Sequence, residues 1–188
     1  MPKHFIVRFR VPLLILALLI SLGGNVMLGL RLYRSAAARS AAADYHAGAL
    51  HDLWQLGLYN IGGAVDARDR DDDIKAYREH MRMVQQALYG SGLSAEAVSQ
   101  ARGDGAFSEL ATVLDRYAQL TGFLSVAESG ITAEDTARLE SIRHDVEILV
   151  AAYPAAFMAE AGAQEIADRD RQVCRDVEQT DLAKPLCE

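Results

Sequence analysis

The sequence predicts an all-α protein in which a single N-terminal transmembrane helix continues into an antiparallel bundle of about four to five helices. Three observations lead to this prediction. Residues 11–30 carry no formal charge, apolar residues make up 51% of the chain against only 7% aromatics, and the apolar spacing downstream is helical. Sheet proteins use more Val, Ile and aromatic residues, so we expect no extensive sheet.

The uncharged stretch is long enough to cross a bilayer. Twenty residues at a rise of 1.5 Å span roughly 30 Å, the thickness of the hydrocarbon core. A cleaved secretory signal is the alternative, because small residues at Ser21 and Gly23 follow a first apolar run with the spacing of a cleavage site. Apolar residues continue after these small residues as far as Leu30. The whole run is longer than the apolar core of a signal peptide, so we favour a retained anchor over residues 11–31.

One face of this predicted anchor carries small residues at helical spacing. It comprises Ala17, Ser21, Gly24 and Leu28, with Asn25 beside it. Small side chains let a second helix approach closely, and an amide within a membrane favours a hydrogen-bonding partner. Helices that simply face lipid also tolerate small residues. We predict that this face and the bundle contact a protein partner or a second copy of the chain.

The orientation of the anchor depends on the two cysteines. Three basic residues precede the span and three follow it, which leaves the positive-inside rule undecided. Cys174 and Cys187 fit one disulfide in an oxidising compartment, whereas two reduced thiols in the cytoplasm are the alternative. We therefore predict a single-pass protein of the bacterial inner membrane, with residues 1–10 in the cytoplasm and the C-terminal domain in the periplasm.

Residues 32–48 are rich in alanine and predict a helical stalk, and residues 49–188 predict the extracytoplasmic bundle. Glycine and proline pairs divide the bundle into helices. The expected breaks fall at residues 90–92, 103–105, 129–130 and 153–154. Thr132 is a good N-cap for the helix that follows it, and Pro154 suits the first turn of a last helix that runs to about residue 179.

The charge distribution excludes one class of partner. Residues 44–188 contain 13 basic and 26 acidic side chains, a net charge of −13, while residues 1–43 contain six basic and no acidic ones. Binding to DNA or RNA relies on a cationic surface that replaces counterions. We therefore expect no nucleic-acid partner.

Metal and cofactor signals are weak. Asp69, Asp71 and Asp73 match the start of a calcium loop, but Ile74 and His80 occupy the positions that require Gly and Glu. Carboxylates near a helix start explain the cluster more simply. His80, Met83 and His144 are the candidates for a soft metal, yet their placement also suits packing or surface residues. We predict no metal site and no cofactor.

No motif of a known enzyme class is present, so we predict a protein that is not an enzyme. The leading hypothesis is an accessory or assembly subunit of an envelope or membrane complex. A periplasmic ligand or metal sensor that signals through a partner is the second, because the order of parts is similar to that of the four-helix periplasmic modules of chemoreceptors. The third is a periplasmic inhibitor or immunity-type binder, whose acidic surface meets a basic target.

Overall fold

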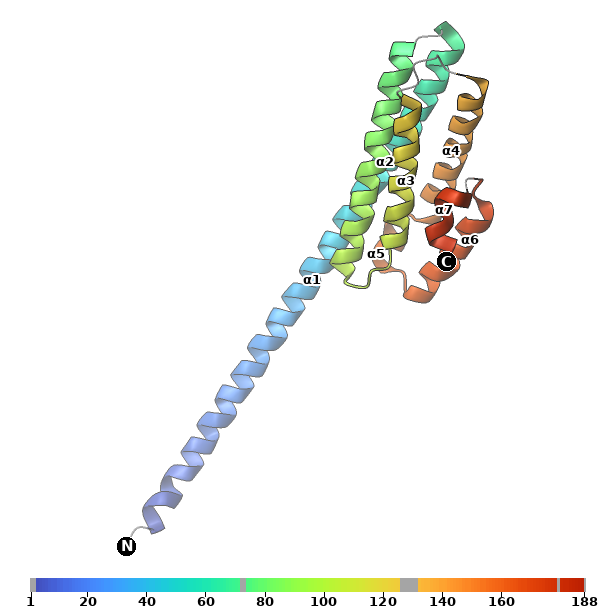
Figure 1. The fold of residues 1–188 in the computed structure, drawn as a ribbon. Coiled ribbons are helices and arrows are strands. Elements are labelled where there is room, and N and C mark those ends of the chain that lie inside the picture. The colour runs from blue at the N-terminus through green and yellow to red at the C-terminus, as the bar shows by residue number, and fades with distance from the viewer. Residues whose placement is uncertain (1–2, 72–73, 126–131, 179, 188) are drawn as a thin grey trace. The chain divides into compact units, whose positions relative to one another are not determined.

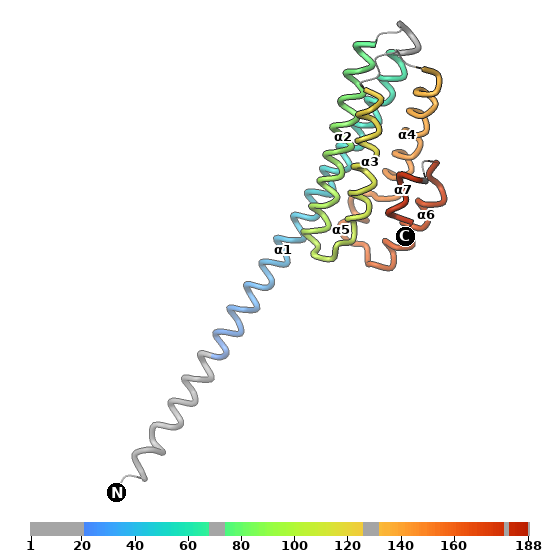
Figure 2. Tube along the Cα trace, viewed as in Figure 1, coloured from blue at the N-terminus to red at the C-terminus, as the bar shows by residue number. Residues whose placement is uncertain are grey.

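The computed structural model describes the backbone of residues 3–71, 74–125, 132–178 and 180–187, and the side chains of residues 21–67, 74–125, 132–178 and 181–187 (Figures 1 and 2). These residues form helices joined by short turns, with no strand among them, which confirms the all-α prediction. The helices are α1 (Lys3–Asp71), α2 (Ile74–Arg102), α3 (Ser108–Ser125), α4 (Ala133–Ala152), α5 (Ala155–Glu160), α6 (Ala163–Asp176) and α7 (Thr180–Cys187).

The chain divides into two compact units within α1. The first unit is residues 1–39 and the second is residues 40–188. In the second unit the last part of α1 packs against α2, where Gly57 approaches Ala87, and α6 and α7 pack against α4 and α3 (Figure 1). Ala43 and Ala47, which the sequence assigned to a stalk, are buried in this unit.

The bundle core is aliphatic with a few large aromatic rings. Trp54 of α1, Tyr117 of α3 and Tyr153 after α4 are fully buried, together with leucines and isoleucines from α1 to α4. Phe107 packs edge-on against Tyr153 with ring centroids 6.3 Å apart. Burial of apolar surface contributes about 25 cal/mol per Å² to the free energy of folding and is the main source of stability in such a bundle.

The predicted break at residues 90–92 is wrong, because α2 runs through it. A Cβ on Gly90 would lie 3.1 Å from Leu53 of α1, and one on Gly92 would lie 3.2 Å from the carbonyl oxygen of Ala111 on α3. Ser91 between them is buried and donates to the Ala87 carbonyl at 2.7 Å. These small residues let α2 approach both neighbours closely, so they serve packing and do not end the helix.

Other predicted boundaries are confirmed. Gly103 and Gly105 have φ values of 75° and 69°, which suit glycine and turn the chain between α2 and α3. Thr132 caps α4, since its Oγ1 accepts from the Asp135 amide and the Asp135 carboxylate accepts from the Thr132 amide. Pro154 is the N-cap residue of α5. The expected break at residues 129–130 lies outside the described residues.

The predicted last helix is divided in the structure. The backbone leaves the helical region at Ala161 and Gly162, and again at Val177. The Glu165 carboxylate accepts a hydrogen bond from the Gly162 amide at 2.7 Å, which caps the N-terminus of α6. Three short helices, α5, α6 and α7, therefore replace one long one, and they fold back onto the bundle.

Candidate functional site

A row of side chains on α1, here called the outer face, is a candidate contact surface among the described residues of the second unit. It consists of Tyr45, Ala49, Asp52, Leu56 and Tyr59. Tyr45 is 73% exposed, Leu56 40% and Tyr59 76%, whereas Ala49 is half-buried. Isolated exposed apolar residues are ordinary on protein surfaces, but three large ones in one row are typical of a contact surface.

The spacing of these residues explains why they share a face. They follow intervals of four and three residues, which at 100° per residue keeps all five within an arc of about 80° on the helix. Leu50, Trp54 and Ile61 fall on the opposite side and are fully buried in the core. The helix therefore carries two apolar stripes, of which the bundle covers one.

The charge on this part of α1 has one sign. Residues 40–67 contain Asp44, Asp52 and Asp66 and no lysine or arginine. Asp52 lies within the outer face, is exposed and has no ion-pair partner among the described residues. A partner that carries a cation opposite Asp52 would match this surface electrostatically.

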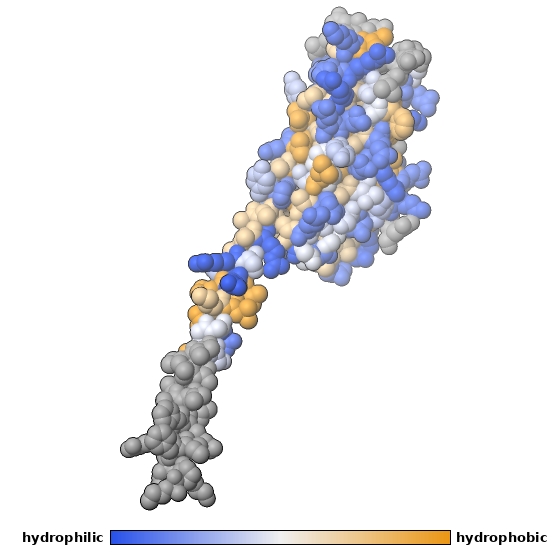
Figure 3. Space-filling model, turned by 60° about the vertical axis from the view of Figure 1, so that its left-hand side comes forward, coloured by the Kyte–Doolittle hydropathy of each residue, from blue (hydrophilic) through white to orange (hydrophobic). Residues whose placement is uncertain are grey.

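The described part of the predicted anchor is apolar and uncovered. Its exposed large side chains are Leu22, Val26, Met27, Leu28 and Leu30, and Leu32 and Tyr33 of the predicted stalk follow them. Figure 3 shows orange side chains on this unit next to the grey residues. Over the residues described, no helix has an apolar stretch long enough to cross a membrane. Residues 11–20 of the predicted span lie outside the described side chains.

The described side chains of the predicted helix-packing face are exposed. Ser21, Gly24, Asn25 and Leu28 are exposed, and a Cβ placed on Gly24 would meet no atom within 4 Å. Ala17 lies outside the described side chains. Small side chains at this spacing suit the close approach of a second helix.

A groove between α2 and α3 is the second exposed apolar surface. Tyr89 is 53% exposed and Leu93 57%, and the hollow beside them holds about 350 Å³. Gly92 forms part of its lining, and Glu96 and Asp115 add negative charge. This groove offers an alternative contact for a partner, in a different part of the same unit.

The predicted disulfide is present. Cys174 of α6 and Cys187 of α7 are bonded, with their Cα atoms 5.7 Å apart. The bond holds α7 to α6, while Ala183 and Leu186 of α7 are buried against the bundle. Arg116 of α3 adds a hydrogen bond from Nη1 to the Asp181 carbonyl oxygen at 3.2 Å. The C-terminal segment is therefore fixed by a covalent bond and by packing.

The weak metal candidates are not brought together. Nδ1 of His80 lies 3.0 Å from Oδ1 of Asn60, and its ring packs against Gly63 of α1, where a Cβ would lie 2.5 Å from Cε1. His80 therefore joins α1 to α2. Met83 is half-buried on α2 and His144 is exposed on α4. Within the described ranges, no three His, Cys, Asp or Glu residues are placed to hold a metal ion.

Arg102 is a structural residue that the sequence analysis missed. Its guanidinium donates to the carbonyl oxygens of Met158 at 2.9 Å and Ala161 at 2.6 Å, at the end of α5, and pairs with Asp104 at 2.8 Å. Burial raises the pKa of Asp104, but hydrogen bonds from Arg102 and from the Ala106 amide bring it below its usual range. Arg102 lies 56 positions before Met158 and 59 positions before Ala161, so no local sequence pattern predicts these contacts.

No known protein family, curated protein or solved structure matches this chain.

Proposed function

We propose that the chain is a membrane-anchored interaction protein without enzymatic activity, whose helical domain lies in the periplasm of a bacterial cell. In this proposal it is an accessory or assembly subunit of an inner-membrane complex, and α1 is its main contact with a protein partner. The observation that carries the proposal is the outer face of α1, because three large apolar side chains lie exposed there on a helix whose opposite side already fills the core.

Two further observations support the membrane and the compartment. The exposed apolar side chains of residues 22–33 have no cover within the described chain, and lipid or a partner helix would remove them from water. The disulfide between Cys174 and Cys187 suits an oxidising compartment such as the periplasm. A reporter fused after Glu188 tests the topology, because activity of a cytoplasmic reporter would contradict it.

Co-purification from native membranes tests the interaction. The full-length chain is expected to bring down a protein partner in a fixed ratio, and Leu56→Asp with Tyr59→Asp is expected to lose it, since two carboxylates would be buried in the contact. Glu140→Lys and His144→Asp on exposed positions of α4 are the controls. Gly24→Leu with Asn25→Leu is expected to weaken the same association if the anchor takes part in it.

An inhibitor or immunity-type role predicts a different result from the same experiment. The partner would then be soluble and basic, since the domain is acidic. An integral membrane partner favours the subunit role. If the variant with Leu56→Asp and Tyr59→Asp still binds the partner, whether integral or soluble, the assignment of the contact to α1 is contradicted.

A further inference from the structure

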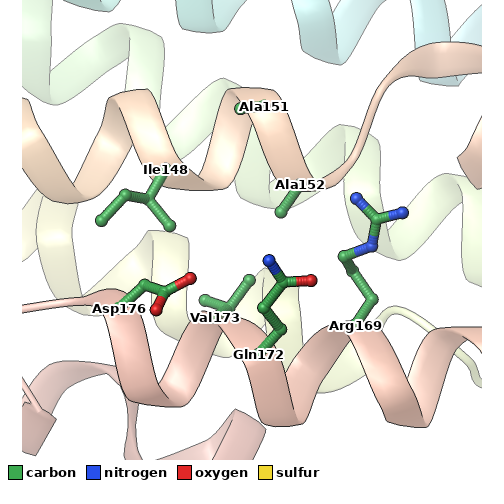
Figure 4. Close-up of a pocket in the computed structure, with 7 residues that line it drawn as sticks. All are labelled: Ile148, Ala151, Ala152, Arg169, Gln172, Val173 and Asp176. Atoms are coloured by element: carbon green, nitrogen blue, oxygen red, sulfur yellow. The ribbon is translucent and has the colours of Figure 1, made fainter.

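A small hollow between α4 and α6 is lined by polar side chains that have no hydrogen-bond or ion-pair partner among the described residues. It holds about 200 Å³, and its lining comprises Ile148, Ala151 and Ala152 from α4 and Arg169, Gln172, Val173 and Asp176 from α6. Figure 4 shows the three polar side chains in order along α6, on the side of that helix that faces α4, with Ile148 and Ala152 pointing toward them. The hollow exists because two alanines of α4 lie where larger side chains would fill the space.

Arg169 stands at one end of the hollow, held by an aromatic ring. Its guanidinium carbon lies 4.8 Å from the centre of the Phe157 ring, which fixes the group by a cation–π contact. Arg102 satisfies its donors on carbonyl oxygens, whereas no group in the described part of the chain accepts a hydrogen bond from Arg169. A fixed guanidinium with unused donors is suited to bind a carboxylate.

Asp176 stands at the other end and is the last residue of α6. Asp176 is exposed, and its negative side chain meets the negative end of the helix dipole, which is unfavourable. No cationic side chain among the described residues pairs with it. A bound ammonium group would relieve this repulsion, and the Gln172 amide between the two ends can both donate and accept.

The spacing of the two charges limits the ligand. Seven residues of helix separate the Cα atoms of Arg169 and Asp176 by about 10 Å along the axis of α6, which favours a ligand that carries its two charges at opposite ends. The hollow holds about 200 Å³, less than the roughly 300 Å³ at which pockets for drug-sized ligands begin. The apolar wall of α4 suits a short hydrocarbon chain between the charges.

We propose that this hollow binds a small zwitterion whose carboxylate contacts Arg169 and whose ammonium group contacts Asp176, with a few methylene groups against Ala151 and Ala152. The inference uses no residue of α1 and stands apart from the proposed interaction function. It adds a ligand-binding role to the same domain, and the ligand class is that of amino acids with the amino group a few carbons from the carboxylate.

Titration calorimetry on the purified full-length chain in detergent tests the proposal. The probes are glycine, 3-aminopropanoate, 4-aminobutanoate, 5-aminopentanoate and 6-aminohexanoate, with butanoate and butylammonium as singly charged controls. Binding is expected to be strongest at an intermediate chain length and at least about tenfold weaker for either singly charged control, since one charge-assisted contact is lost. No measurable binding of any zwitterion at millimolar concentration would overturn the proposal.

Three variants locate the site. Arg169→Gln and Asp176→Asn are each expected to weaken binding about tenfold or more, and Ala151→Leu is expected to block it by filling the hollow. Arg175→Gln and Asp168→Asn on exposed positions of α6 are matched controls and should bind as the unchanged chain does. Circular dichroism confirms folding of each variant. Equal binding by all five variants would place the ligand elsewhere and contradict the assignment.

Discussion

The hydroxyl of Tyr117 on α3 donates a hydrogen bond to Oδ2 of Asp145 on α4 at 2.6 Å, and both side chains are fully buried. The other carboxyl oxygen of Asp145 accepts from the amide of Glu178 at 2.7 Å. Burial, and then the neighbouring Asp145, raise the pKa of Tyr117 far above its usual range, so the phenol keeps its proton as the donor. One carboxyl group thus joins α3, α4 and the segment after α6.

Tyr117→Phe removes this hydrogen bond without changing the ring. The free energy of unfolding should fall by about 1–3 kcal/mol, because a buried carboxyl oxygen loses its donor. Urea unfolding followed by circular dichroism measures the change. Tyr89→Phe on the exposed side of α2 is the control and should stay within about 0.5 kcal/mol. Equal stability of the two variants would mean that the Tyr117 contact contributes nothing.

Asp170 should make the domain less stable as the pH rises. Burial raises its pKa above the ordinary value of 3.8, as does the nearby negative charge of Glu109, although the hydrogen bond from Tyr153 lowers it. The folded state therefore holds this proton at a pH where the unfolded state has lost it, and stability falls as the pH rises from 3.8 through the folded-state pKa.

Asp170→Asn isolates this contribution. The stability of the variant relative to the unchanged chain should increase as the pH is raised from about 3 to about 7, since the variant has no proton to lose there. Urea midpoints across this pH range measure the difference. Asp168→Asn is the control on an exposed position of α6. A relative stability that decreases over the same range would contradict the raised pKa of Asp170.

Thr132→Ala should destabilise the start of α4. The variant loses the Oγ1 acceptor that caps the Asp135 amide, and the capping box with it. The expected loss is about 1 kcal/mol in the free energy of unfolding. Thr112→Ala within α3 removes a comparable hydroxyl from an exposed helical position and should change stability by less than about 0.5 kcal/mol.

Replacement of both cysteines, Cys174→Ser with Cys187→Ser, should lower the free energy of unfolding by about 3 kcal/mol, the value for a closed loop of about 15 residues. A reducing agent should have a similar effect on the unchanged chain and none on the double variant. Limited proteolysis should then cleave first near α7, because only packing and the hydrogen bond from Arg116 still hold it. Cleavage that begins elsewhere would show that α7 stays in place without the bond.

Local signals in the sequence predicted much of the fold. The turn at residues 103–105, the cap at Thr132, the break at Pro154 and the pairing of Cys174 with Cys187 each depend on residues whose chemistry acts nearby or has one possible partner. The failure at Gly90 to Gly92 has a tertiary cause. Glycine there serves close contact with α1 and α3, which sequence spacing does not distinguish from a turn.

The candidate sites were predictable to a smaller extent. The outer face of α1 was not predicted, because helical spacing shows that apolar residues share a face but not which of two apolar stripes the bundle covers. The contacts of Asp145 and Arg102 join residues far apart in the sequence. The hollow beside Arg169 depends on which residues of α4 and α6 face each other, and this pairing is fixed only by the folded bundle.

Site-specific photo-crosslinking in cells tests the central claim most directly. A photoreactive phenylalanine analogue replaces Tyr45, Leu56 or Tyr59 in the outer face, Leu93 in the α2–α3 groove, or His144 on α4. The account predicts a discrete cross-linked protein, either a partner or a second copy of the chain, from the outer-face positions and none from His144. Cross-links from Leu93 alone, or from no outer-face position, would contradict it.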